Sequence, residues 1–205
     1  MYFFLLSYSI LGAGIKFIDS AYDEKTFNKK IAMILAPFLG LLWAYTMFIN
    51  PFSATILFSI LLGVLFKGKI DNIAHLSGVI VIIPLIFFLG IELLIVPLLF
   101  LAGAATLDEF GNDVLDREST KNKETIWFRC ILYFFDQRWM LKSALLFLSI
   151  IGLIPFYFFV ALILFDYAYL SVRFLSEVKR GKREGFDQLD VKIKSILAQK
   201  ILSKN

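Results

Sequence analysis

The chain has 205 residues, of which 59% are hydrophobic and only 19% carry a charged side chain. Together with a mean hydropathy of +0.78, this composition excludes an ordinary soluble domain, which needs a more charged surface. The single cysteine, Cys130, excludes an internal disulfide framework and a cysteine-based metal cluster. The sequence therefore predicts an all-α integral membrane protein, located in the cell membrane and crossing it several times.

Five apolar runs follow one another along the chain, at about residues 2–18, 31–49, 52–66, 74–107 and 143–172. The last two are too long for one span, because a helix of about thirty residues measures roughly 45–50 Å against a hydrocarbon core of ~30 Å. Gly90 and Pro97 interrupt the fourth run, and Gly152 and Pro155 interrupt the fifth. We therefore predict that each of these two runs is a hairpin, which gives a bundle of about seven transmembrane helices.

The basic residues predict the orientation of this bundle. With seven spans, all 21 Lys and Arg lie in or beside segments on one side of the membrane. Since cytoplasmic loops collect Lys and Arg, the N-terminus is predicted outside and the C-terminus in the cytoplasm. The alternative, in which residues 74–107 or 143–172 form single tilted spans, would place a basic segment on the opposite face. The predicted domains are a transmembrane helical bundle at 1–175 and a cytoplasmic basic amphipathic tail at 176–205.

Two segments have the pattern of amphipathic helices at the membrane interface. Residues 124–142 combine separated charges with large apolar side chains, as in a helix that lies in the interface. The C-terminal tail repeats apolar residues at helical spacing, and the preceding "KRGKRE" favours anionic lipid headgroups as partners. The sequence holds no nucleic-acid motif, so no nucleic acid is expected as a partner.

Acidic residues gather where odd-numbered spans reach the predicted cytoplasmic face. Asp19 and Asp23 are four positions apart, and Asp113 and Asp116 are three apart, so each pair shares one face of a helix. Paired carboxylates suit Mg²⁺, which keeps several waters and takes further ligands from substrate phosphates. These four residues are therefore candidate catalytic and metal-binding residues. The alternative for each pair is a solvated helix end whose charge is balanced by neighbouring Lys and Arg.

Both acidic motifs resemble those of a known family. "NDVLDRE", residues 112–118, resembles the Asn-Asp-x-x-Asp motif of the UbiA superfamily of membrane-embedded prenyltransferases, and "IDSAYDEKTFNK" resembles the family's earlier Asp-rich stretch. The number of spans between the two motifs is similar as well. The chain departs from the family in having about seven helices in place of the usual nine. Ile18 stands where an Asn normally precedes the first Asp, and Thr120 stands where the second motif normally ends in Asp.

The resemblance implies a membrane enzyme that uses Mg²⁺ to bind a polyprenyl or other lipid diphosphate and to transfer the prenyl group. The metal would neutralise the departing diphosphate, and Asp108 would join the four paired aspartates as a ligand. Side chains near the same face would bind the substrate: Lys16, Asn112, Arg117, Lys67 and Lys69.

Other polar residues complete the predicted substrate-binding set. Asp71, Asn72 and His75 in "DNIAH" suit a metal site, a phosphate site or an acid/base pair, and the alternative for His75 is a polar cap at the interface. Asp166 lies within the last span, where an ionisable group usually faces a partner or a cavity.

Two other classes of function stay open at this point. One is a small channel or transporter, in which short helices broken by Gly and Pro form the binding site. The other is a non-catalytic membrane subunit whose basic loops bind a soluble partner. A transporter should place ionisable groups deep in several spans, whereas only Asp166 is so placed here, and acids crowded at one face favour an enzyme acting on a lipid phosphate.

Overall fold

The computed structural model describes residues 1–66, 68, 72–119, 130–131, 133–135 and 137–202, with the side chains at 112–113, 115–119 and 183–202 excepted. This part of the chain is helical, with no strand in it, which confirms the all-α prediction. Its helices are α1 (Tyr2–Tyr22), α2 (Lys29–Phe48), α3 (Pro51–Phe66), α4 (Ile73–Phe88), α5 (Ile95–Ser119), α7 (Trp139–Ile150) and α8 (Phe156–Leu202).

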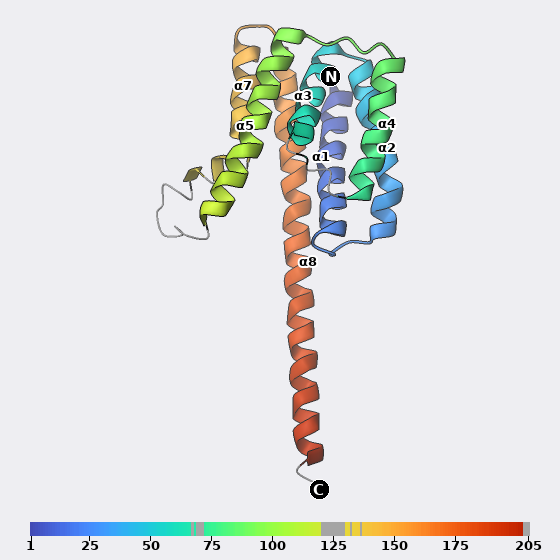
Figure 1. The fold of residues 1–205 in the computed structure, drawn as a ribbon, viewed down its shortest axis with the longest axis vertical. Helices are drawn as coiled ribbons and strands as arrows, with labels where there is room; N and C mark the ends of the chain where they lie inside the picture. The colour runs from blue at the N-terminus through green and yellow to red at the C-terminus, as the bar shows by residue number, and fades with distance from the viewer. Residues whose placement is uncertain (67, 69–71, 120–129, 132, 136, 203–205) are drawn as a thin grey trace.

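The helices pack side by side in a bundle (Figure 1). The N-terminus and the α4–α5 and α7–α8 connections lie at one end, whereas the α1–α2 loop lies at the other, from which the second half of α8 projects. Among the described residues, three helices are long and apolar enough to cross a membrane: α1, α2 and the Phe156–Lys182 part of α8. Three others, α3, α4 and α7, are apolar but shorter. The fold therefore supports membrane association.

Each of the two long apolar runs is divided into two separate helices, as predicted, but α4 packs mainly on α2 and α5 on α3, so these two do not form a tight hairpin. The run at 74–107 divides into α4 and α5, with Gly90 between them at a φ of +60°, and the run at 143–172 divides into α7 and α8, with Gly152 between them at a φ of +78°. Glycine adopts such positive φ angles without the steric penalty of a Cβ. The breaks therefore follow from local backbone chemistry that is visible in the sequence.

Two helices continue past the ends that the apolar pattern predicts. α5 runs on to Ser119 although its apolar stretch stops near residue 108, and α8 runs unbroken through the predicted domain boundary at 175/176. Charged residues such as Glu, Lys and Arg are good helix formers, so the end of an apolar run need not end the helix. Of the predicted interfacial helix at 124–142, residues 124–129, 132 and 136 lie outside the described residues, and its last four residues form the start of α7.

Close helix contacts at glycines bring the site-bearing helices together. A Cβ on Gly12 of α1 would lie 2.0 Å from the carbonyl oxygen of Phe165 in α8, so the two backbones touch there. In the same way, a Cβ on Gly40 of α2 would lie 2.7 Å from the carbonyl oxygen of Gly78 in α4. Small residues permit such approaches in membrane proteins. As a result, the end of α1 lies beside the middle of α8 and the start of α4.

Candidate functional site

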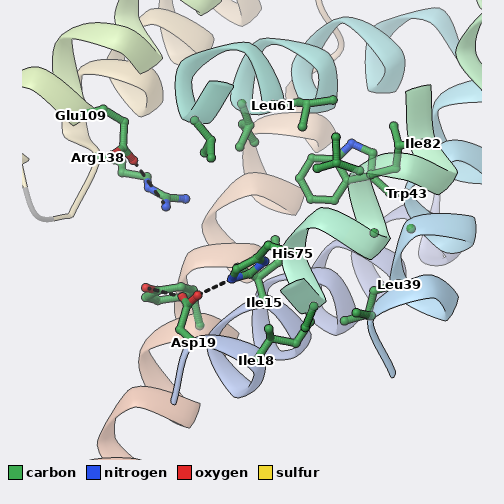
Figure 2. Close-up of a pocket in the computed structure, with 18 residues that line it drawn as sticks. Ile15, Ile18, Asp19, Leu39, Trp43, Leu61, His75, Ile82, Glu109 and Arg138 are labelled. Carbon is green, nitrogen blue, oxygen red and sulfur yellow. Dashed lines mark hydrogen bonds and ion pairs between the residues drawn. The ribbon is translucent and has the colours of Figure 1, made fainter. Parts of the chain in front are cut away.

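The bundle encloses a pocket with a cavity volume of about 200 Å³. Its lining comes from α1 to α5, from α8 and from the turn before α7. Figure 2 shows the polar lining residues toward one side and the apolar ones of α2 to α4 toward the other, with Ile15 and Ile18 of α1 beside His75 and Asp19. The polar side has Asp19, His75, Glu109, Arg138 and Tyr169, and the apolar side includes Leu39, Trp43, Leu61 and Ile82.

An aspartate and a histidine form the first polar group of the pocket. His75 Nε2 lies 2.5 Å from an Asp19 carboxylate oxygen, and the Tyr169 hydroxyl donates a hydrogen bond to the other oxygen over 3.4 Å. His75 occupies the first turn of α4 because the Asn72 side chain accepts the His75 backbone N–H at 2.8 Å and thereby begins the helix. A carboxylate that holds an imidazole in this way fixes its orientation, so that the other ring nitrogen can exchange a proton with a bound molecule.

Arg138 provides the positive charge of the pocket. Its guanidinium lies 3.8 Å from the Glu109 carboxylate and 5.7 Å from the centre of the Tyr169 ring. Burial lowers the pKa of Arg138, but the negative groups around it, Asp166 first and then Glu109, raise it further, so the net pKa is above its ordinary value. The side chain is therefore a permanent cation suited to binding a phosphate or carboxylate.

The backbone of Arg138 is unusual. This residue directly precedes α7 and has a φ of 52° and a ψ of 44°, the left-handed conformation. Side chains other than glycine, asparagine and aspartate rarely adopt it, and residues held there often belong to functional sites.

Trp43 supplies an unsatisfied donor on the apolar side. The residue is 6% exposed, and its indole Nε1–H is buried without a hydrogen-bond partner among the described residues. A buried donor without a partner costs about 1–3 kcal/mol. A bound molecule with an acceptor atom at this place would recover part of that cost.

Asp19 and His75 are the sequence-predicted site residues that line the pocket. Asp108, expected as a metal ligand, lies outside the lining and is 1% exposed. Its two carboxylate oxygens accept the backbone N–H groups of Met140 at 3.1 Å and Leu141 at 2.8 Å. The tertiary structure therefore gives Asp108 a capping role at the start of α7, because it brings this carboxylate to N–H groups that lack a helical partner.

The other predicted residues have partners away from the pocket lining. Asp166 of α8 lies 2.8 Å from the ammonium of Lys142 in α7, which agrees with the expectation that an ionisable group in the last span has a partner. Asp23 forms the C-terminal cap of α1, and its backbone N–H donates to the Asp19 carbonyl at 2.8 Å. Asn72 caps α4, as described above.

Lys16, expected to bind phosphate, forms an ion pair with Glu24 at 2.6 Å. The second Glu24 oxygen accepts the Ser176 hydroxyl of α8 at 2.6 Å. Burial raises the pKa of Glu24, but the hydrogen bonds from Lys16 and Ser176 and the nearby positive charges outweigh it, so the net pKa lies below the ordinary value. This network ties the α1–α2 loop to α8.

The structure does not describe the side chains of the remaining predicted residues. Lys67, Lys69 and Asp71 lie outside the described residues. Asn112, Asp113, Asp116 and Arg117 lie in α5, but their side chains are not described. Among the described residues, no three His, Cys, Asp or Glu side chains form a possible metal site. The described residues thus do not by themselves provide a Mg²⁺ site, and the expected ligands from α5 stay a prediction.

Sequence reasoning missed Glu109, Arg138 and Trp43. Glu109 directly follows Asp108 and was not selected, because the family resemblance indicated Asp108 as the ligand. Arg138 lies in the segment interpreted as an interfacial helix, and the one available signal was a basic residue directly before an apolar run. Trp43 lies inside an apolar stretch, and nothing in the sequence distinguishes it from a packing residue.

Comparison with family models, with curated proteins and with solved structures finds no match to this chain.

Proposed function

We propose that the chain is a membrane-embedded enzyme that binds an anionic amphiphile, a lipid phosphate or diphosphate, in the pocket between its helices. One observation carries this proposal: charged and polar side chains from separate elements meet on one side of a cavity whose other side is apolar. An amphiphile likewise has a charged head at one end and an apolar tail at the other. Arg138 would bind the phosphate through its guanidinium, and Leu39 and Leu61 would contact the hydrocarbon chain of the lipid.

The Asp19–His75 pair is the proposed acid/base group. With Nε2 facing the carboxylate at 2.5 Å, Nδ1 is the ring nitrogen left to take a proton from an attacking hydroxyl or to give one to a leaving group. Tyr169 supports the same carboxylate. This arrangement suits group transfer or hydrolysis at the head of a lipid.

The substrate that we propose to test first is a polyprenyl diphosphate, with transfer of the prenyl group to a hydroxyl acceptor or to water as the reaction. The allylic C–O bond would break, diphosphate would leave, and His75 would take the proton of the acceptor. The support for this substrate is the resemblance of the two acidic motifs to those of membrane prenyltransferases, together with the apolar side of the pocket. Two carboxylates, Asp19 and Glu109, share the polar side and repel a bound diphosphate unless cations accompany it. The assay therefore includes Mg²⁺, for which Asp113 and Asp116 are the proposed further ligands.

We also propose a multi-pass topology with about seven spans, the N-terminus outside and the C-terminus in the cytoplasm. The location of Lys and Arg supports it. So does the arrangement of the helices, because the N-terminus and the α4–α5 and α7–α8 connections share one end of the bundle. By the same argument, the loop between α1 and α2, with Lys25, belongs to the cytoplasmic end.

A transporter is the second candidate, and the Lys142–Asp166 ion pair favours it. Lys142 is 5% exposed, and its partner lies in α8, one of the helices able to span a membrane. Ionisable pairs inside a bundle are frequent along transport pathways. The two candidates differ in whether the bound lipid is chemically changed, which the following experiment measures.

The experiment uses the full-length protein in lipid nanodiscs with a polyprenyl diphosphate, with and without Mg²⁺. It measures the dissociation constant and the release of diphosphate. We expect Arg138→Gln to weaken binding by about 10- to 100-fold, because a charged hydrogen bond to phosphate is lost. We expect His75→Gln to bind as wild type but to slow release by at least about 100-fold.

Arg173→Gln is the matched control, since Arg173 is half-exposed on α8 and pairs with Glu177 at 3.2 Å. Wild-type affinity in Arg138→Gln would show that the pocket is not the binding site. Binding without any release of diphosphate would favour the transporter. Asp113→Asn and Asp19→Asn test the metal ligands, and unchanged Mg²⁺ dependence in both variants would remove them from that role.

A further inference from the structure

Three charged side chains lie around Arg138 without lining the pocket: Asp108 and Lys142, which are buried, and Asp166, which is partly buried. Asp108 is 1% exposed and Lys142 is 5% exposed. Burying charges costs free energy that ion pairing only partly returns, so a group of them beside a functional residue calls for an explanation. Their contacts converge on the backbone on both sides of Arg138.

Asp108 holds the C-terminal side of Arg138. Its carboxylate accepts the N–H groups of Met140 and Leu141, the second and third residues after Arg138. Since Asp108 belongs to α5, these two hydrogen bonds fix the start of α7 relative to the helix that also carries Glu109.

Lys142 binds the backbone on the N-terminal side of Arg138. Its ammonium donates a hydrogen bond to the carbonyl oxygen of Gln137, the residue before Arg138. The same ammonium lies 2.8 Å from the Asp166 carboxylate of α8 and 5.0 Å from the centre of the Trp139 ring. The turn is thus fixed to α8 as well as to α5.

Between these two attachments, Arg138 has the left-handed backbone conformation, with a φ of 52°. This conformation is unfavourable for a side chain with a Cβ, and it persists where the surroundings impose it. In this conformation the guanidinium lines the pocket beside Glu109 (Figure 2). An ordinary turn in the same place would direct the side chain elsewhere.

We infer that Asp108, Lys142 and Asp166 are positioning residues that impose the left-handed conformation on Arg138 and so aim its guanidinium at the anionic group of the ligand. This inference rests on the proposed function for the identity of the ligand. Its structural part concerns the backbone of one residue and stands without any ligand. A merely structural role for the three side chains would stabilise the bundle but would leave phosphate recognition independent of them.

The first test needs no ligand. Arg138→Gly and Arg138→Ala remove the same guanidinium but differ in the ease with which they adopt a positive φ. We expect the Gly variant to melt about 2–4 °C above the Ala variant. The difference in melting temperature between the Gly and Ala variants should be smaller in the background of the double variant Lys142→Met, Asp166→Asn, which removes this ion pair without leaving an unpaired charge. Equal melting temperatures in the otherwise wild-type chain, or a gap that the double variant leaves unchanged, would overturn the inference.

The second test measures phosphate recognition, with a lipid phosphate and the alcohol of the same chain as probes. We expect the double variant to reduce the preference for the phosphate by about tenfold, and to have no further effect in an Arg138→Gln background. Thr46→Val, a buried polar change outside the pocket lining, is the control and should keep the preference. The inference would be overturned if Arg138→Gln lost the preference for the phosphate over the alcohol while the double variant kept it in full.

The two tests distinguish a failure of the proposed function from a failure of this inference. The proposed function fails if the wild-type protein does not prefer the phosphate, or if Arg138→Gln keeps the preference. In that case the comparison of Gly and Ala at position 138 still decides whether the positioning residues act on the backbone.

Discussion

Replacing Gly12 with alanine tests the contact that holds α1 against α8. The new Cβ would lie 2.0 Å from the carbonyl oxygen and 2.8 Å from the carbonyl carbon of Phe165. Ordinary contacts begin at 3.4 Å, so the two helices must separate by 3.4 − 2.0 = 1.4 Å. Both partners are backbone, and no side-chain rotation can relieve the clash.

The cost can be set against the gain in helix propensity. Overpacking costs about 1–3 kcal/mol, and a contact between backbones belongs at the upper end, whereas Gly to Ala inside a helix gains about 1 kcal/mol. The expected net loss is about 2 kcal/mol, which lowers Tm by about 4–8 °C for a chain of this size. Gly103→Ala in α5 is the control, because nothing lies within 4 Å of its added Cβ, and its Tm should not fall.

The separation should also affect the site. Asp19 lies on α1 and Tyr169 on α8, and their hydrogen bond is already 3.4 Å long, so a further 1.4 Å breaks it. The assay is thermal unfolding in detergent, followed by tryptophan fluorescence, together with the affinity for a lipid phosphate. A Tm for Gly12→Ala equal to or above that of Gly103→Ala would refute the reasoning, because it would mean that the backbones of α1 and α8 do not touch.

Two other predictions concern the α1–α2 loop and the topology. Glu24 has a lowered pKa, so the stability from its contact with Lys16 is present above the unfolded pKa of 4.5 and is lost as the pH falls through the folded pKa. The Tm measured from neutral to acidic pH should therefore decline more steeply in wild type than in Glu24→Gln. Parallel curves of Tm against pH would contradict this. Pro51→Cys and Ile91→Cys, each in a Cys130→Ser background, should react with a membrane-impermeant maleimide only from outside, and labelling of position 91 from the cytoplasm would exclude the proposed orientation.

Local features of the sequence predicted much of the fold. The breaks in the two long apolar runs lie at Gly90 and Gly152, whose positive φ angles need no help from distant residues. The apolar runs predicted the helices themselves, but the ends of α5 and α8 were misplaced. Apolar patterning reports where a chain leaves a hydrocarbon environment, whereas a helix of charged residues can continue in water.

The candidate site was predictable only in part. Asp19 and His75 were both selected as functional, yet their pairing was not foreseen, since they are 56 positions apart. Asp108 was expected as a metal ligand from the family resemblance, and its carboxylate caps a helix that begins more than thirty residues later. Arg138 was missed, because an isolated basic residue at the edge of an apolar run has no local signature of function.

The sequence by itself determined that the chain is helical and apolar enough for a membrane and that its long apolar runs break at glycines. These properties are local, because burying an apolar segment depends on the segment's own residues. Only the tertiary structure decided which charges meet. The approach of α1 to α8 at Gly12 and of α2 to α4 at Gly40 sets the distances between helices, and hydrogen bonds and ion pairs act over a few ångströms, so the partners of Asp19, Asp108 and Arg138 follow from helix packing alone.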